Sequence, residues 1–426
     1  MTQASEDRER GGRRRLPVLA GNLHPRYVVW ELTLLCDHAC THCGSRAGVA
    51  REHELSTREA LAVVEELAAL GAGEVVLIGG EAYLHPGFLE VVSALREASI
   101  TPVMTTGGRG VDAALARRMA EAGMQRVGVS VDGLRETHDQ MRARKGSFDD
   151  ALRCIEVCRE AGLKVTANTN LNRLNEADFE ALYEVLRDAG ARGWQVQLTA
   201  PLGRAADRPE MLLQPYDLPA LFPRIAAIKQ RGLREGMLLM PGNNLGYFGP
   251  EEGLLRSQRP SHNDHFGGCQ AGRYVMGIES DGAVKGCPSL QTKSYVGGNV
   301  ADGLAAVWND APKLAFARER TVEDLWGFCR ECPYASTCLG GCTFTAHSFF
   351  GRPGNQPYCH YRALEHGRRG LRERLVPKDA ADGQPFDHGL FDIVVEPAGA
   401  PEPARPERHT LVQLTRPHTR RGAPPS

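Results

Sequence analysis

The sequence predicts an α/β fold with a parallel sheet, and two observations carry this prediction. Short β-rich segments alternate with amphipathic stretches of ten to fifteen residues from about residue 26 to residue 199. Strands that alternate with helices in this way form parallel sheets with right-handed crossovers. We count six strand–helix units, the last strand included, which is too few for a closed eight-stranded barrel. A cysteine-rich segment follows and predicts a second, smaller domain.

The predicted elements follow in chain order. The first strand, residues 26–32, leads into a loop with three cysteines, and a capping box at residues 56–59 starts a helix that ends at Gly71. Further strands are predicted at residues 74–78, 101–105, 126–131, 164–169 and 194–199, and helices at 87–98, 111–122, 148–161 and 175–189. In barrels built from parallel strands and helices, the catalytic groups lie at the C-terminal ends of the strands. The cysteine loop follows such a strand end and is therefore a candidate site.

The composition excludes several classes of protein. The 426 residues are 42% hydrophobic and 24% charged, which is enough for a large core. A formal net charge of −1 argues against a general polyanion-binding surface, so we expect no nucleic-acid partner. The arginines between residues 8 and 15 are expected to form a solvated tail. No stretch has the length of a membrane span or the form of a secretion signal, which predicts a cytoplasmic protein without a membrane partner.

Cysteine usage is the most informative compositional feature. Twelve cysteines without an export signal are not expected to form a disulfide framework, because cytoplasmic thiols stay reduced. Ten of them fall in two dense groups. The other two, Cys154 and Cys158, lie one helical turn apart and are expected to be buried as small apolar residues.

The first group is Cys36, Cys40 and Cys43, in a C-x3-C-x2-C array. A closed structural zinc or iron–sulfur site needs four ligands, whereas three thiolates on a four-iron cluster leave one iron open. Half of a zinc ribbon is the alternative interpretation. His38 and His42 lie inside the array and are expected to be exposed loop residues rather than ligands.

This spacing resembles that of the radical SAM enzymes. The resemblance implies an open, partial (β/α)6 barrel and a [4Fe-4S] cluster whose free iron binds S-adenosylmethionine. It also implies cleavage of that cofactor to a 5′-deoxyadenosyl radical, which abstracts hydrogen from a substrate. One electron must be supplied, so an electron donor such as flavodoxin or ferredoxin is an expected partner.

The resemblance also assigns residues to the cofactor. Gly79, Gly80 and Glu81 follow the second strand and match a Gly-Gly-Glu-Pro motif that binds the amino group, although Ala82 replaces the proline. Ser130, at the end of the fourth strand, is expected to contact the ribose or the carboxylate.

Two further assignments leave alternatives open. Asp132 fits a ribose contact and a turn-capping carboxylate beside Gly133 equally well. A later arginine is expected to bind the cofactor's carboxylate, and the sequence does not choose between Arg142 and Arg144.

The second group holds seven cysteines and resembles the SPASM extension of peptide-modifying radical SAM enzymes, which carries two auxiliary [4Fe-4S] clusters. By this resemblance the first auxiliary cluster takes three ligands, Cys269, Cys287 and Cys342. The second takes four, Cys329, Cys332, Cys338 and Cys359. The first cluster is one ligand short, so a non-cysteine group completes it or the position is open to water or substrate. Zinc knuckles are the alternative interpretation.

One close relative is disfavoured by the residues after Cys287. Anaerobic sulfatase-maturating enzymes place an aspartate base directly after the second SPASM cysteine, and here Pro288 and Ser289 follow. No general base can be transferred to this chain, so its catalytic residues are not assigned.

Five regions are expected: a basic flexible tail (1–24), the partial barrel (25–215), a bridging region (216–265), the SPASM domain (266–376) and a disordered tail (377–426). The bridging region contains a helix at 216–232 and a glycine- and asparagine-rich loop at 241–249, which is either a connector or part of the substrate wall. Residues 360–375 are expected to be helical. Residues 391–396 could pair with a partner as a strand, but a loose tail is expected there.

The favoured function is oxidative modification or cross-linking of a peptide during maturation of a ribosomally made natural product. The alternatives are a small-molecule or tetrapyrrole oxidoreductase with the same cofactors, and a non-catalytic zinc-binding interaction protein. Cys36 lies too close to the start for an N-terminal leader-binding domain, so a separate recognition protein or direct recognition by the barrel is expected. The residues do not fix the substrate, the bond formed or the oligomeric state.

Overall fold

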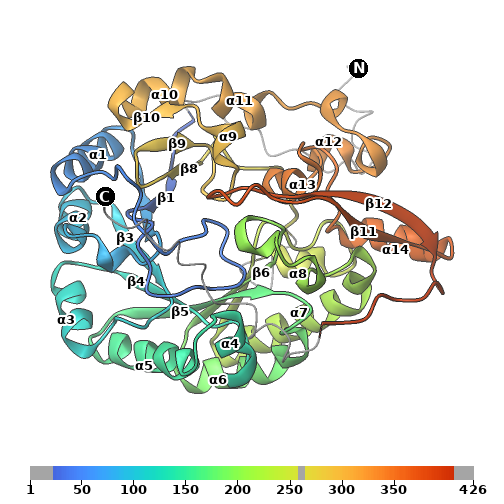
Figure 1. The fold of residues 1–426 in the computed structure, drawn as a ribbon, viewed down its shortest axis with the longest axis horizontal. Helices are drawn as coiled ribbons and strands as arrows, with labels where there is room; N and C mark the ends of the chain where they lie inside the picture. The colour runs from blue at the N-terminus through green and yellow to red at the C-terminus, as the bar shows by residue number, and fades with distance from the viewer. Residues whose placement is uncertain (1–22, 258–263, 407–426) are drawn as a thin grey trace, which may run out of the picture.

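The computed structural model describes residues 23–257 and 264–406, and its central feature is a ten-stranded sheet. The strand order is β10-β9-β8-β1-β2-β3-β4-β5-β6-β7 (Figure 1). The six predicted strands are β1 (Tyr27–Glu31), β2 (Glu74–Ile78), β3 (Thr101–Thr106), β4 (Arg126–Ser130), β5 (Lys164–Leu171) and β6 (Gly193–Leu198). They pair in parallel, in sequence order. The predicted α/β fold with an open, partial barrel is confirmed.

Helices pack along the outside of this sheet, as right-handed crossovers require. They are α1 (Thr57–Ala69), α2 (Phe88–Glu97), α3 (Ala113–Glu121), α4 (Arg135–Met141), α5 (Ser147–Glu160) and α6 (Phe179–Asp188). The capping box at Ser56 and Glu59 forms as predicted. Helix α4 was not predicted, because its seven residues carry no clear apolar period.

The sheet also continues beyond the six predicted strands. After α7 (Leu218–Glu235), β7 (Leu238–Pro241) pairs in parallel with β6, and β8 (Val275–Ile278) pairs in parallel with β1. The antiparallel strands β9 (Ala283–Lys285) and β10 (Gly298–Asn299) complete it. The sheet therefore continues across the boundaries expected at residues 215 and 265, and it links the barrel to the cysteine-rich segment.

Residues 264–368, which we call the cysteine-rich lobe, contain mostly short helices. These are α9 (Thr292–Tyr295), α10 (Leu304–Asp310), α11 (Pro312–Glu319), α12 (Ala335–Cys338), α13 (Thr343–Phe350) and α14 (His360–Arg368). A short helix, α8 (Glu252–Arg256), precedes the lobe. The loop at residues 241–249 is part of the lobe's packing, because Tyr247 is fully buried against Phe266 and Cys342.

The C-terminal region differs from the sequence prediction. The helix expected at 360–375 ends at Arg368, and β11 (Leu371–Asp379) and β12 (Leu390–Pro397) form an antiparallel hairpin. The expected disordered tail is thus wrong for residues 377–397, and residues 391–396 pair with this chain's own β11. The composition of the tail masked the β-rich run in β12. Residues 407–426, and residues 1–22 of the N-terminal tail, lie outside the described residues.

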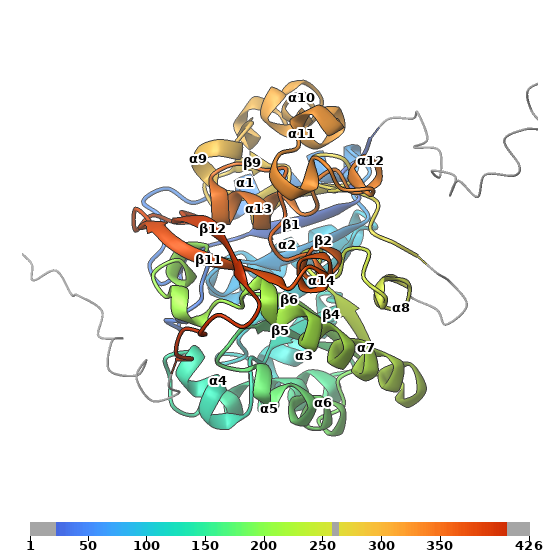
Figure 2. The ribbon, with the colours of Figure 1, turned by 90° about the vertical axis from the view of Figure 1, so that its right-hand side faces the viewer.

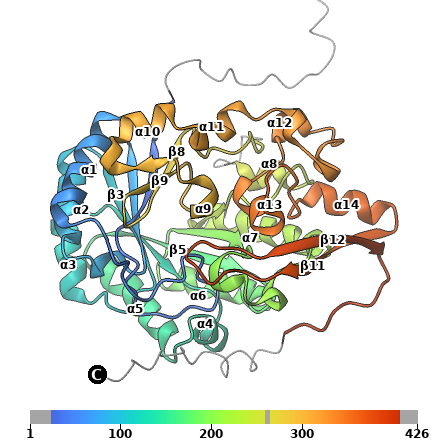
Figure 3. The same ribbon diagram turned by 45° about the horizontal axis from the view of Figure 1, so that its top comes forward.

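The hairpin lies between the two parts of the molecule. Figure 2 shows α9 to α12 of the lobe above the hairpin and α4 to α6 of the barrel below it. Figures 1 and 3 show the hairpin, in red, running from the edge of the lobe to the dark blue loop that follows β1. Within the described part of the chain, no helix combines the length and apolar composition that a membrane span requires.

Candidate functional site: the cysteine loop and the cysteine-rich lobe

Residues 32–56, which we call the cysteine loop, follow β1 at the C-terminal edge of the sheet. Backbone amides of the next strand end hold the start of the loop, with Gly80 N donating to Thr33 O (2.7 Å) and Glu81 N to Leu35 O (2.9 Å). The Glu54 carboxylate accepts from Thr33 Oγ1 (2.7 Å), which fixes the return of the loop. The position of the three cysteines is therefore set by the end of the parallel sheet.

The glycine pair of the predicted cofactor motif has a clear packing role. A Cβ atom on Gly80 would lie 2.0 Å from Leu35 O, and one on Gly79 would lie 2.3 Å from Thr33 O. Real Cβ atoms do not approach backbone oxygen this closely, so only glycine fits at either position. This close approach is made to the cysteine loop itself, and the contact of the motif with a cofactor stays a prediction.

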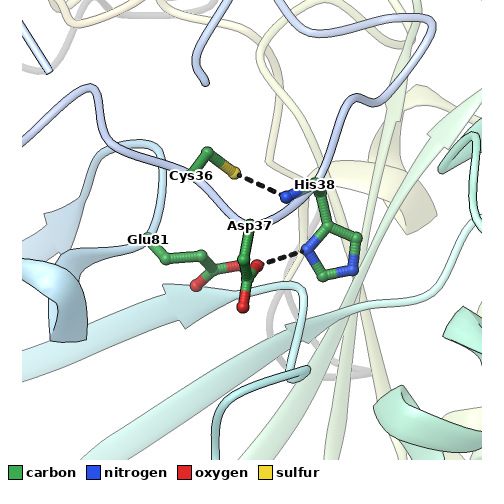
Figure 4. A group of neighbouring side chains, drawn as sticks. All are labelled: Cys36, Asp37, His38 and Glu81. Carbon is green, nitrogen blue, oxygen red and sulfur yellow. Dashed lines mark hydrogen bonds and ion pairs between the residues drawn. The ribbon is translucent and has the colours of Figure 1, made fainter. Parts of the chain in front are cut away.

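Glu81 is buried between the cysteine loop and β3 (Figure 4). Its carboxylate accepts from Thr106 Oγ1 (2.6 Å) and from the backbone amide of Gly107 (2.7 Å). Burial raises the pKa of Glu81 to about 7, although these two hydrogen bonds oppose the change. The carboxyl group is therefore oriented by the protein before any ligand is present.

Cys36, Asp37, His38 and Glu81 present donor atoms within 4.8 Å of one another. Asp37 Oδ1 and His38 Nδ1 lie 2.8 Å apart, and Cys36 Sγ accepts from His38 N at 3.4 Å (Figure 4). The expectation that His38 and His42 are exposed is wrong, since their exposed fractions are 6% and 9%. Both rings pack inside the site, where half-buried Asp37 is the partner of His38 and fully buried Asp132 is the partner of His42.

Asp132 joins the cysteine loop to β5. Its Oδ2 forms an ion pair with Arg142 Nη2 at 2.6 Å and lies 3.2 Å from His42 Nε2, and its Oδ1 accepts from the backbone amide of Asn170 at 2.9 Å. Burial alone would raise the pKa of Asp132, but the charge of Arg142, followed by that of His42, outweighs it and holds this pKa well below its usual range. The carboxylate is thus the counter-ion of Arg142, and this role replaces the turn cap considered from the sequence.

The two candidate arginines occupy different environments. Arg142 is buried, and its Nη1 donates to Cys40 Sγ at 3.5 Å. Arg144 Nη2 contacts Asp150 at 3.5 Å, and its side chain is 36% exposed. Only Arg142 reaches the cysteine loop. Ser130 ends β4, half-buried, in register with Asn168 of β5.

The sequence analysis missed Gly203 and Arg204, which follow β6. Arg204 Nε donates to Cys40 O at 2.7 Å, and its backbone amide donates to Cys43 O at 3.0 Å. A Cβ on Gly203 would lie 2.3 Å from Gly44 O. A glycine just after a predicted strand was the available signal, but an arginine 164 residues from its partner leaves no local pattern.

The seven cysteines of the lobe form two groups. All twelve cysteines are free of disulfides. Burial raises the pKa of Cys287 to about 12, and nearby Cys269 and Cys342 add to the effect. These three thiols lie among apolar side chains, including Leu290, Phe316 and Phe344.

The second group lines one pocket, whose cysteines are Cys329, Cys332, Cys338 and Cys359. Burial, followed by the other three thiols, raises the pKa of Cys338 well above its ordinary value. Thiolates crowded in this way repel one another unless a cation binds them, so the arrangement fits a four-thiolate metal centre. The same two sets of residues were expected from the sequence, one of three ligands and one of four.

The fold and the thiols together define the class of protein. Residues 30–186 match the model of the radical SAM superfamily, and residues 269–333 match the iron–sulfur cluster-binding domain named SPASM. The chain belongs to the radical SAM superfamily and carries a SPASM domain.

Two proteins with established names are similar to this chain in sequence. A mycofactocin maturase, MftC, from Mycobacterium ulcerans is 30% identical over 374 residues, which cover 84% of this chain and 93% of the relative. An AdoMet-dependent heme synthase from Methanosarcina barkeri is 28% identical over 350 residues, covering 79% of this chain and 97% of the relative.

Solved structures share the fold. Streptococcus suis SuiB bound to S-adenosylmethionine has a TM-score of 0.62 at 17% identity, over 76% of this chain and 74% of SuiB. The protein named anSMEcpe, with bound AdoMet, also has a TM-score of 0.62, at 18% identity, over 80% of this chain and 94% of that chain.

Proposed function

We propose that this radical SAM enzyme oxidatively modifies or cross-links a peptide during maturation of a ribosomally made natural product. The observation that carries the oxidative chemistry of this proposal is the division of the lobe's thiols into a group of three and a group of four, in the lobe whose strands β8 to β10 continue the sheet that positions the cysteine loop. A substrate that loses hydrogen and then forms a new bond must also give up an electron. Two auxiliary clusters held by these groups would accept it.

The cysteine loop binds the first cofactor in this proposal. Cys36, Cys40 and Cys43 would hold a [4Fe-4S] cluster, which with S-adenosylmethionine supplies the 5′-deoxyadenosyl radical. Glu81 would accept from the cofactor's ammonium group with the carboxylate that Thr106 and Gly107 already orient. Ser130 would contact the ribose or the carboxylate from the end of β4.

Arg142 has a different proposed role from the one expected. Its guanidinium is already paired with Asp132 and directed at Cys40 Sγ. We assign it to the ligand sulfur, where a buried donor stabilises a thiolate. Arg144 points to Asp150 and is not proposed as a cofactor contact.

The peptide substrate is supported by the solved structures with this fold. SuiB has been solved with the precursor peptide SuiA, and anSMEcpe with the peptide Cp18Cys. A separate leader-recognition protein and a flavodoxin- or ferredoxin-type electron donor are the partners that we propose with it. The absence of an aspartate after Cys287 argues against formylglycine formation.

A tetrapyrrole substrate is the second candidate. An AdoMet-dependent heme synthase and an Fe-coproporphyrin III synthase, both from Methanosarcina barkeri, match over 97% and 89% of their lengths. Under this proposal the same thiols hold the same clusters, and only the substrate differs.

The test is anaerobic turnover of the reconstituted enzyme with S-adenosylmethionine and a reductant. We expect 5′-deoxyadenosine, and loss of hydrogen atoms from a short peptide encoded beside the gene, measured by mass spectrometry. Decarboxylation of Fe-coproporphyrin III in a parallel reaction, with the peptide unchanged, would replace the first candidate with the second. Three clusters require about twelve iron atoms per chain. A chain with abundant zinc and little iron would contradict both candidates.

A further inference from the structure

The hairpin tip, residues 380–389, contacts the cysteine loop directly after its third cysteine. Phe386 N donates to Gly44 O at 3.1 Å. Arg46 Nε donates to Asp387 Oδ1 at 2.8 Å, and Arg46 Nη2 donates to Asp387 Oδ2 at 3.1 Å. The guanidinium therefore donates two parallel hydrogen bonds to the carboxylate, and this geometry makes an arginine–carboxylate pair directional.

This ion pair is protected from solvent. The Arg46 side chain is 13% exposed and that of Asp387 is 7% exposed, whereas Asp207, the second partner of Arg46, is 46% exposed. Asp207 also accepts two hydrogen bonds from Arg46, at 2.6 and 2.8 Å. Buried pairs are screened less by salt than exposed ones, so the pair with Asp387 is the less salt-sensitive of the two. Asp387 Oδ2 also accepts from Gln384 N at 3.1 Å, so the same carboxylate shapes the tip.

Two residues at the contact adopt left-handed backbone conformations, Arg46 with φ of 51° and Phe386 with φ of 56°. Residues with a Cβ persist there only where the surrounding structure holds them. Arg46 lies in the cysteine loop where the hairpin tip contacts it, and Phe386 lies in the hairpin tip where the cysteine loop contacts it. The conformation of the cysteine loop after Cys43 and that of the hairpin tip therefore support one another.

The tip is itself anchored to other parts of the protein. Gly203 N donates to Asp387 O at 2.8 Å, next to the Arg204 contacts with the cysteine loop. The ammonium group of Lys285, a buried residue of β9, lies 3.8 Å from the centre of the Phe386 ring. The tip thus contacts the cysteine loop, the end of β6 and the cysteine-rich lobe at once.

We propose that Arg46 and Asp387 form a latch through which the C-terminal hairpin fixes the cysteine loop in its cluster-binding conformation. Both are positioning residues, because neither side chain contacts a cysteine thiol. The proposal concerns retention of the loop's metal and is independent of the substrate.

Hydrogen–deuterium exchange of the full-length chain tests the latch. It is measured on two samples, the anaerobically reconstituted enzyme and the apo chain. In Arg46→Gln we expect amides of residues 43–48 to exchange on the order of tenfold to a hundredfold faster, because hydrogen bonds between charged groups are lost. Amides of β2 to β5 should keep their protection. Asp387→Asn should give the same pattern, and Arg46→Lys should restore part of the protection by keeping the charge.

Two control variants separate the latch from general destabilisation. Asp207→Asn removes only the exposed partner of Arg46, and Asp392→Asn breaks an exposed pair with Lys378 elsewhere in the hairpin. Asp392→Asn should leave exchange of residues 43–48 unchanged, and Asp207→Asn should accelerate it less than Asp387→Asn does. Unchanged exchange in Arg46→Gln and Asp387→Asn, or equal acceleration in the controls, would overturn the proposal.

A second measurement follows the metal. In Arg46→Gln the iron of the cysteine loop should be lost to a chelator several-fold faster than in the unmodified enzyme, as for other changes behind metal ligands. The change that S-adenosylmethionine causes in the electron paramagnetic resonance spectrum should weaken with it. Equal rates of iron loss would contradict the latch, and they would leave the proposed peptide substrate untouched because no substrate is present.

Discussion

The cysteine loop and the cysteine-rich lobe hold their thiols in different ways. The loop follows a buried parallel strand, and backbone hydrogen bonds from the ends of β2 and β6 hold it in place. In the lobe, helices of four and eight residues, α12 and α13, lie between the later thiols, and the cysteines themselves are part of small apolar clusters. The loop is therefore shaped by the sheet, whereas the thiols of the lobe lie in small apolar clusters apart from the main core, which a bound metal would stabilise.

The largest expected effect comes from a ligand of the loop. Cys40→Ala should reduce 5′-deoxyadenosine formation by more than about a hundredfold. Loss of a group that only supports a metal ligand costs up to about a hundredfold, and loss of the ligand itself should cost more. The fold should persist, because the sheet does not depend on this thiol. Cys154→Ala is the matched control, a fully buried cysteine expected to cost about 1 kcal/mol of stability and no iron. Anaerobic product assays and iron analysis measure both, and loss of iron from Cys154→Ala would contradict the assignment.

Removal of metal should affect the lobe more than the barrel. A chelator-treated chain is expected to be cut by protease between residues 269 and 359 while residues 57–198 stay protected, because structural metal sites contribute their binding energy to folding. Limited proteolysis with mass spectrometry measures this. Equal protection of both regions would show that the lobe folds without iron, as the barrel does.

Arg142 and Arg144 offer a comparison inside the barrel. Arg142→Met leaves Asp132 buried without its main counter-ion and should lower the free energy of unfolding by about 3–5 kcal/mol. Arg144→Met removes a longer, more exposed contact and should cost less than about 1 kcal/mol. Denaturant unfolding measures both variants, and similar losses would mean that Asp132 does not depend on Arg142.

An ion pair connects the hairpin to the lobe and should make stability depend on pH. Burial alone would raise the pKa of Glu373, but hydrogen bonding from His366 and the charge of Arg362 outweigh it and lower this pKa to about 2. A lowered carboxyl pKa stabilises the fold above the unfolded value, here 4.5, and the contribution is lost as the pH falls towards 2. The shift corresponds to about 3 kcal/mol.

Glu373→Gln should therefore lose stability at pH 7 and show a weaker fall between pH 4.5 and 2. Thermal unfolding across this range measures the effect. Glu365→Gln, which changes a carboxylate paired with the exposed Arg368, serves as the control and should keep the wild-type profile. Matching profiles for the two variants would show that the Arg362 pair does not hold the hairpin.

The smallest effect is expected where the sheet meets the loop. Gly80→Ala places a methyl group against Leu35 O and should cost about 1–3 kcal/mol, with weaker iron retention. Gly48→Ala is the matched control in the same loop, since no atom lies within 4 Å of its Cβ position. Iron content after gel filtration compares them. Full iron retention in Gly80→Ala would show that the loop can move away from β2 and still hold metal.

The sequence predicted the parts of the fold that local patterns encode. Six strands with alternating helices and a capping box are read from apolar periodicity, and two cysteine arrays are read from spacing. Strands β7 and β8 were missed because each has four residues, too few for a pattern, and gains stability only by pairing with β6 and β1. The hairpin was missed because the composition of the whole tail outweighed the short run in β12.

The same distinction applies to the site. The sequence placed the cysteines of the loop, Glu81 and an arginine after β4 in one region, but it could not choose between Arg142 and Arg144. That choice depends on Asp132, whose carboxylate faces the loop only in the folded chain. The exposure of His42 was predicted wrongly for the same reason, since its buried partner Asp132 lies just after β4 and reaches the loop only in the folded chain. The exposure of His38 was predicted wrongly because the packing of the loop against its surroundings is not visible in a local pattern.

The ion pair between Arg46 and Asp387 joins residues 341 positions apart. A ribosome synthesises the cysteine loop before the hairpin, so a further 341 residues must be made before this contact can form. Iron delivered to the nascent chain would meet thiols that lack one of their supports. Productive assembly of this centre is therefore expected to follow synthesis of the hairpin, and truncation near residue 380 would yield a barrel that folds but loads iron poorly.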